Sequence, residues 1–226
     1  PTPALDLPTP QQAEVIATLE AEVALQEAAL EAVADTARGD FEAWVAAGGQ
    51  WDRPTPTGHY PLDDVATGTL LNLVDPENPG KTTHGPTSME GVIGEAAQLS
   101  GDDNIHFPGV GHVTRVDPLT LSLWIKVPAH FDRAVIIHRS RSWTDAGSQG
   151  YQLLLEDGRP TWSLVHFWPG DAIAIRGLEP IALDEWTHVA VVHDGSATAA
   201  GLSMFIGGVP AQTEVVHDRL TRAITG

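Results

Sequence analysis

Residues 138–170, "HRSRSWTDAGSQGYQLLLEDGRPTWSLVHFWPG", gather three Trp, one Tyr, two His and three Arg in a single segment. Aromatic rings can stack on a sugar ring, and arginine, histidine and acidic side chains can hydrogen-bond to its hydroxyl groups. Aromatic residues are also common in the paired strands of an ordinary β-sandwich. The segment could therefore be an active site, a binding surface or a structural hairpin, and the surrounding elements must decide among them.

The loop "RSWTDAGSQG" in this segment holds Trp143, which no periodicity assigns to a sheet face. A loop Trp beside Arg139, Arg141 and Asp145 has the composition of a sugar-binding platform. The alternative is a Trp that seals one end of a sandwich, with Arg–Asp pairs fixing the loop. The candidate ligand-binding residues are His138, Arg139, Arg141, Trp143, Asp145, His166, Trp168 and Arg176.

The run "TWSLVHFW" reads as a β-strand whose side chains alternate between two faces. Trp162, Leu164, His166 and Trp168 then share one face. We expect Trp162 and Leu164 in the core, and His166 and Trp168 near the rim.

Catalytic patterns fail on their spacing. A retaining glycosidase needs two carboxylates about 5 Å apart, which on one strand calls for acids two residues apart. Glu156-Asp157 and Asp184-Glu185 are adjacent and lie in expected turns. We expect a chain that is not an enzyme.

A metal site is a second possibility. The ten histidines are scattered without a spacing that would place two of them on one ion. Calcium prefers carboxylate and carbonyl oxygens from loops, and the candidates for it are Asp63, Asp102, Asp103 and Asn104. The alternative is that these residues form turns through side-chain-to-backbone hydrogen bonds.

Composition excludes several classes of function. The chain has no cysteine, so this stretch holds no disulfide, thiolate metal site or covalently attached c-type haem. Its net charge of −18 repels phosphate backbones and anionic membranes, which argues against nucleic-acid binding. No apolar run is long enough to span a bilayer, and the first residues lack the features of a signal peptide.

The chain changes character near residue 50. Residues 1–50 are rich in Ala, Glu and Leu, and we expect a long acidic helix capped by Thr9 with Pro10 in its first turn. Its apolar residues, from Ile16 to Trp44, follow a spacing of three and four. This stripe needs a partner, either its own β-domain or neighbouring chain, or a second helix in a coiled coil.

Residues 51–226 show short strands separated by turn residues, which predicts an antiparallel sandwich or jelly roll. Asp157-Gly158 signals a hairpin. Residues 63–104 read as loops with an occasional strand at 96–100. The expected strands are 119–128, 133–140, 151–157, 161–168, 171–177, 186–195, 202–208 and 213–218.

Three motifs follow one another near the end of the chain: "WTHVAV" at 186–191, "DG" at 194–195 and "GLSMFIGG" at 201–208. With "HYPLDD", "GEAAQLSGDDNIHFPG" and "LTLSLWIKVP", the series resembles the laminin-G-like (concanavalin A-like) jelly-roll domain over residues 57–222. The resemblance implies a mainly β, antiparallel jelly-roll sandwich that follows the long N-terminal helix. Domains of this kind usually end with one more strand, which also supplies calcium ligands in relatives, and we expect it beyond Gly226 or from another chain.

More narrowly, "HRSRSWTDAGSQGYQLLLEDGR", "HFWPG" and "EVVHDRLTRAITG" resemble the version embedded in large exported planctomycete-type proteins that also contain a cytochrome c-like region. The resemblance implies a periplasmic or cell-surface setting. We expect a non-catalytic recognition module for a glycan or another extracellular polymer. The alternative is an assembly domain that docks protein partners, including other domains of the same protein, through the helix and an open sheet edge.

Overall fold

A computed structural model of the chain describes residues 8–49, 55–141 and 149–225, without the side chains of residues 34–36 and 141. The chain divides into two compact units, residues 1–55 and residues 56–226. Within the described ranges, no helix combines the length and the apolar character that a bilayer-spanning segment needs.

The first unit is built on one helix, α1 (Pro10–Ala46). The Thr9 side chain accepts a hydrogen bond from the Gln12 backbone, and the Gln12 side chain accepts one from the Thr9 backbone, so a reciprocal capping box starts the helix. The expected Thr9 cap is confirmed. The apolar stripe is exposed along α1: the exposed fraction of Ile16 is 44% and that of Leu30 is 70%.

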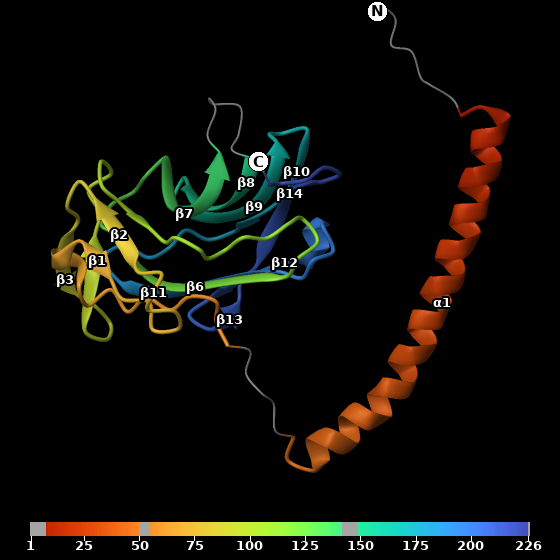
Figure 1. The fold of residues 1–226 in the computed structure, drawn as a ribbon, viewed down its shortest axis with the longest axis horizontal. Coiled ribbons are helices and arrows are strands. Elements are labelled where there is room, and N and C mark those ends of the chain that lie inside the picture. Colours follow the sequence, from red (N-terminus) through yellow and green to blue (C-terminus); the bar gives the residue numbers. More distant parts are fainter. Residues whose placement is uncertain (1–7, 50–54, 142–148, 226) are drawn as a thin grey trace, which may run out of the picture. The chain divides into compact units, whose positions relative to one another are not determined.

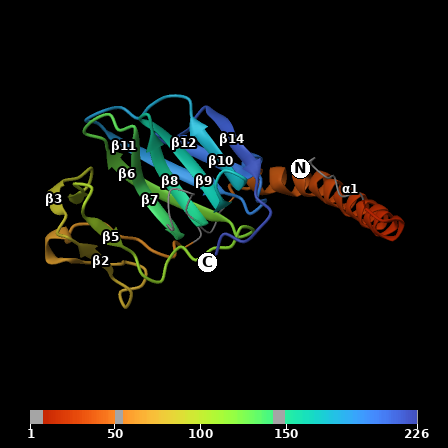
Figure 2. The same ribbon diagram turned by 90° about the horizontal axis from the view of Figure 1, so that it is seen from above.

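Two antiparallel sheets form the β-sandwich of the second unit (Figures 1 and 2). The five-stranded sheet has the order β14-β10-β9-β8-β7, and the four-stranded sheet has the order β13-β12-β11-β6. A mainly β sandwich after an N-terminal helix is the predicted fold, and each predicted strand from residue 119 onward is present. The strands are β6 (Leu119–Lys126), β7 (Arg133–Arg141), β8 (Gln149–Glu156), β9 (Arg159–Phe167), β10 (Asp171–Gly177), β11 (Trp186–His193), β12 (Leu202–Ile206), β13 (Val209–Pro210) and β14 (Thr213–Arg219), with a short 3₁₀ helix η2 (Ala199–Gly201) before β12.

Alternating apolar residues from the two sheets meet in one core. Leu153, Trp162 and Ile173 of the five-stranded sheet are completely buried, as is Val189 of the four-stranded sheet. The indole nitrogen of Trp162 donates to the Val192 carbonyl across the core at 3.1 Å, so the largest buried side chain leaves no polar atom unpaired. The sequence placed Trp162 and Leu164 in the core correctly.

The β8–β9 hairpin turns at Asp157-Gly158, as expected. Both residues have positive φ, 51° and 74°, which is the combination that matches a tight turn to the right-handed twist of its strands. The hairpin fixes the register between β8 and β9, in which Gln152 pairs with Ser163 and Leu153 with Trp162. This register therefore determines which side chains of β8 and β9 face the core and which face away from it.

Residues 63–106 contain more strand than the sequence suggested. A 3₁₀ turn η1 (Val65–Thr67) precedes two small sheets. These strands are short and mostly polar, so they lack the alternating apolar residues that indicate a strand in a sequence. The sheets are β1-β2-β5, from Thr69–Leu70, Gly80–Thr83 and Asn104–His106, and β3-β4, from Thr87–Glu90 and Glu95–Gln98.

The C-terminal segment closes one end of the sandwich. Leu220 and Ile224 are buried in the core. Asp171 accepts hydrogen bonds from the Thr221 backbone and hydroxyl, at 2.7 and 3.0 Å. Desolvation raises the pKa of the Asp171 carboxyl, but these hydrogen bonds outweigh it and hold the pKa below its usual range.

Candidate functional site

A row of polar side chains crosses the outer face of the five-stranded sheet, the face turned away from the core. The strand registers align His138 of β7 with Gln152 of β8, Gln152 with Ser163 of β9, Ser163 with Ala174 of β10, and Ala174 with His217 of β14. Because every second residue of a strand lies on the same face, these five positions form a line across the sheet. We call them the outer-face row.

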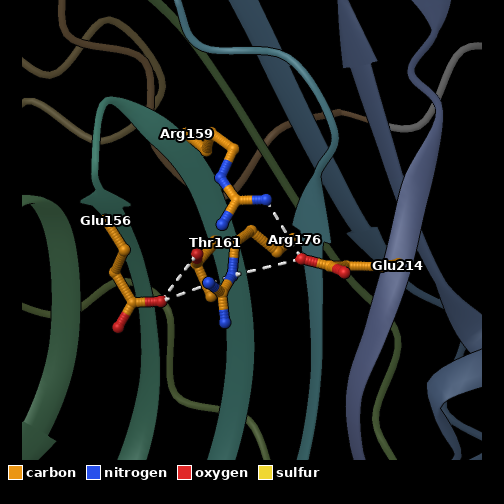
Figure 3. Close-up of polar contacts among 5 residues, drawn as sticks. All are labelled: Glu156, Arg159, Thr161, Arg176 and Glu214. Carbon is orange, nitrogen blue, oxygen red and sulfur yellow. Dashed lines mark hydrogen bonds and ion pairs between the residues drawn. The ribbon is translucent and has the colours of Figure 1, made fainter.

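A second polar group lies along the same face, next to the β8–β9 hairpin (Figure 3). Arg176 lies between Glu156 and Glu214, with its Nε 3.8 Å from a carboxylate oxygen of each. Glu214 also accepts a hydrogen bond from Arg159 at 3.1 Å, and Glu156 accepts one from Thr161 at 2.9 Å. The group has two positive and two negative side chains, and its ion pairs and hydrogen bonds connect β8, β9, β10 and β14.

Two buried polar atoms on this face have no hydrogen-bond partner among the described residues. They are the Ser163 hydroxyl oxygen and the Arg176 Nε. Ser163 is 1% exposed. An unpaired buried hydroxyl costs about 1–3 kcal/mol, and each such group calls for an explanation. Ser163 stands at the centre of the outer-face row, between Gln152 and Ala174.

A pocket of about 420 Å³ opens at one end of the sandwich, and we call it the end pocket. Arg139 of β7 contributes a guanidinium to it, and its Nη2 lies 2.6 Å from the His112 Nδ1. Tyr151 donates its hydroxyl to the Gly111 carbonyl at 3.0 Å. Burial raises the pKa of the Tyr151 phenol, and the Arg139 charge opposes that rise. The pocket is lined by His112, Val113, Arg139, Ser140, Gln149, Gly150, Tyr151, Ile224 and Thr225.

The predicted ligand-binding residues divide between these two places. His138 belongs to the outer-face row, and Arg176 lies on the same face toward the β8–β9 hairpin. Arg139 lines the end pocket, and His166 donates from Nδ1 to the Ala223 carbonyl, 2.6 Å away, in the segment that closes that end. These four candidates therefore lie in two separate places on the sandwich. The Arg141 side chain, Trp143 and Asp145 lie outside the described residues.

Trp168 does not share a face with Trp162. Strand β9 ends at Phe167, and Pro169 follows. Because proline cannot donate a ladder hydrogen bond, strand alternation stops there and no longer places the side chain. The Trp168 ring instead lies edge-on to His217 of the outer-face row, with ring centroids 4.4 Å apart. This is a correction to the sequence-based expectation, and it adds an aromatic ring to the outer face.

The residues proposed for calcium form turns in the structure. Asp63 accepts a hydrogen bond from the Glu95 backbone at 2.8 Å, and Asp103 accepts from the backbone of Ser100 and Gly101. The Asp102 carbonyl faces His84, and Asn104 pairs with Thr83 in the β2–β5 ladder.

In the described part of the chain, the group of ligand-type side chains close enough to share an ion is a different one. It consists of His130, Asp132 and Asp157, and all three are exposed.

Sequence reasoning missed Gln152, Ser163 and His217 on the outer face, and His112, Gln149 and Tyr151 in the end pocket. Their alternation along each strand was readable. The register between strands was not, because β14 pairs with β10 across a separation of about 40 residues and contains a bulge. The polar line across the sheet exists only once that register is known.

Comparison with known families agrees with the fold. The family model of the concanavalin A-like lectin/glucanases superfamily matches residues 99–225, which is more than half of the chain. A search of curated proteins found no match. The matched region spans both sheets of the sandwich and the closing C-terminal segment. The chain therefore belongs to the concanavalin A-like lectin/glucanase superfamily, whose laminin-G-like members are carbohydrate- or protein-binding modules.

Proposed function

We propose that the β-sandwich is a non-catalytic module that recognises a glycan or a similar extracellular polymer on the outer face of its five-stranded sheet. The observation that carries the proposal is the buried Ser163 hydroxyl without a partner, at the centre of the outer-face row. His138, Gln152 and His217 offer further donors and acceptors on the same line. Sugar hydroxyls can both donate and accept hydrogen bonds, which suits such a row.

The side chains around Ser163 support a bound sugar chain. Ala172 and Ala174 beside it are short, while Trp168 stands against His217 at one margin of the face. An aromatic ring at the margin of the face can stack on a sugar ring. Arg176 and Glu156 offer charged partners further along the same face.

The arrangement of acids supports binding without catalysis. Glycosidases place two carboxylates on either side of the scissile bond. On this face the Arg176 guanidinium lies between the carboxylates of Glu156 and Glu214, so the two acids do not face each other across an open gap (Figure 3).

The test is a glycan-array assay on the wild-type chain, followed by titration of the best ligand. Replacing Ser163 by Ala should weaken that binding by about threefold to tenfold, because one hydrogen bond to the ligand is lost. The same change should leave the free energy of unfolding unchanged or raise it, since it removes an unpaired buried hydroxyl.

Ser203→Ala is the matched control, because Ser203 is exposed on β12 of the other sheet. It should leave both affinity and stability unchanged. A Ser163→Ala variant that binds as tightly as wild type, or an array without any binding, would contradict the proposal.

Calcium and cellular setting belong to the same proposal. Calcium binding by Asp63, Asp102, Asp103 and Asn104 stays a prediction, and we propose that the module works in a larger exported protein, in the periplasm or at the cell surface. The array run with calcium and with a chelator tests the first point. Glycan binding that survives chelation would show that the outer-face row needs no ion.

The exposed stripe of α1 favours a second function, assembly with other protein segments. Its exposed apolar residues include Leu19, Val23 and Leu30, which line a shallow hollow on one helix face. An apolar helix face is stable when it packs against another apolar surface. Sedimentation over a range of concentrations tests this, with Leu19→Lys/Val23→Lys as the variant. A chain that stays monomeric at high concentration argues against self-assembly.

A further inference from the structure

The end pocket contains an arginine whose charge no carboxylate neutralises within the described part of the chain. The ion pairs there involve His130, Arg159, Arg176 and Arg222, and none involves Arg139. Its neighbour is the His112 ring, with Nη2 2.6 Å from Nδ1 and 3.0 Å from Nε2. A guanidinium only donates, so the ring nitrogen accepts in this contact.

Arg139 is half-buried and lines a cavity of a strongly acidic protein. The net charge is −18, with 30 acidic residues against 12 Lys and Arg. A half-buried arginine that faces a cavity creates a local positive potential there, and this potential attracts an anion. Its planar fork matches the two oxygens of a carboxylate. The surrounding negative field opposes a ligand with several charges, which favours a single carboxylate over a phosphate.

The remaining polar groups of the pocket are neutral and mostly acceptors. Tyr151 uses its proton on the Gly111 carbonyl, so its oxygen can still accept. Gln149 donates from Nε2 to the carbonyls of Ala223 and Thr225, both at 3.2 Å, which leaves its Oε1 available to accept. Acceptors of this kind suit hydroxyl groups. A cavity of about 420 Å³ has room for a ring of sugar size.

We propose that the end pocket binds a sugar-sized carboxylate, with Arg139 as the partner of the carboxylate and Gln149 and Tyr151 as acceptors for its hydroxyl groups. The pocket shares no residue with the outer-face row, so this site does not depend on the function proposed above. The carboxylate can belong to a free sugar acid or to a uronate unit in a glycan, and the two sources are distinguished below.

The experiment is isothermal titration of the full chain with D-galacturonate, a trisaccharide that carries a single galacturonate unit, and neutral D-galactose. We expect at least one of the two acids to bind, at least about tenfold more tightly than galactose, because a charge-assisted contact is worth about 1.5–3 kcal/mol. Binding of the free acid identifies a small sugar acid as sufficient. Binding of the trisaccharide alone assigns the site to a uronate within a chain. If neither acid binds, or galactose binds equally well, the proposal is wrong.

Arg139→Gln should reduce this binding by at least about tenfold. Arg133→Gln is the matched control, since it removes an exposed arginine of the same strand, β7, that does not line the pocket, and it should leave acid binding unchanged. Arg139→Lys keeps the charge but loses the fork, and we expect an intermediate loss. If circular dichroism shows that Arg139→Gln does not fold, Arg139→Lys replaces it as the test variant. Binding that survives in a folded Arg139→Gln variant, or that is lost equally in Arg133→Gln, would overturn the assignment.

Discussion

Single buried polar residues show how closely function and stability are linked in this domain. Ser163 and His193 are both almost fully buried, yet only His193 is paired. His193 Nε2 accepts from the Ala197 backbone at 3.3 Å, so its Nδ1 carries the proton and donates to the Asp117 carbonyl at 3.2 Å. The contact with the Ala197 backbone requires an unprotonated Nε2, so the imidazole is neutral in this arrangement. Ser163 has no such partner, which is why we assign it to ligand binding.

The His193 site predicts a pH dependence of stability. Desolvation lowers the pKa of His193 below its usual value of 6.5, although the Asp117 carbonyl and Asp194 oppose this. The neutral form is favoured in the folded state, so the contribution is fully present above about pH 6.5 and is lost as pH falls through the folded pKa. Urea unfolding of wild type between pH 7.5 and 5 should show stability falling on acidification.

His193→Gln should flatten part of this decline, although it lowers stability at neutral pH. His130→Gln is the control, because His130 is an exposed histidine and its loss should leave the pH profile unchanged. Parallel profiles for wild type and His193→Gln would show that His193 does not contribute.

At the scale of elements, local sequence signals decided where helices and strands begin. The capping box of α1 and the Asp157-Gly158 turn both depend on neighbouring residues, and both were readable from the sequence. The strands β1 to β5 depend on pairing with distant segments, and most of them were missed. The contrast follows from the range of the interactions that specify each element.

The capping box gives a prediction for α1. Thr9→Ala removes the side-chain acceptor and should lower helix stability by about 0.5–2 kcal/mol, seen as fraying of the first turns and lower ellipticity at 222 nm. Thr18→Ala is the matched control within the same helix. Thr18 bonds back to the Glu14 carbonyl, so this change should raise helicity slightly. Equal effects of the two changes would contradict the assignment of Thr9 as the cap.

At the scale of the whole molecule, the C-terminal segment is part of the sandwich. Ile224 is 3% exposed and lines the end pocket as well as the core. Ile224→Ala should lower the free energy of unfolding by about 2–5 kcal/mol, because it leaves a cavity where two sheets and the closing segment meet. Ile93→Ala, at a side chain that is 86% exposed, should change it by less than about 0.5 kcal/mol. Chemical denaturation measures both, and similar values would show that the segment is not packed as described.

The sequence by itself determined the class of fold, most of the strands of the sandwich, the helix cap and the core positions of Trp162 and Leu164. These features depend on periodicity and on contacts between near neighbours, which a sequence displays directly. The sequence also proposed Arg139, His138 and Arg176 as binding residues, but it could not show which of them lie at the same site. Only the tertiary structure decided that Arg139 faces the end pocket while His138 and Arg176 lie on the outer face. The physical reason is strand register, because pairing between distant strands determines which side chains become neighbours, and a shift of one residue would exchange the two faces.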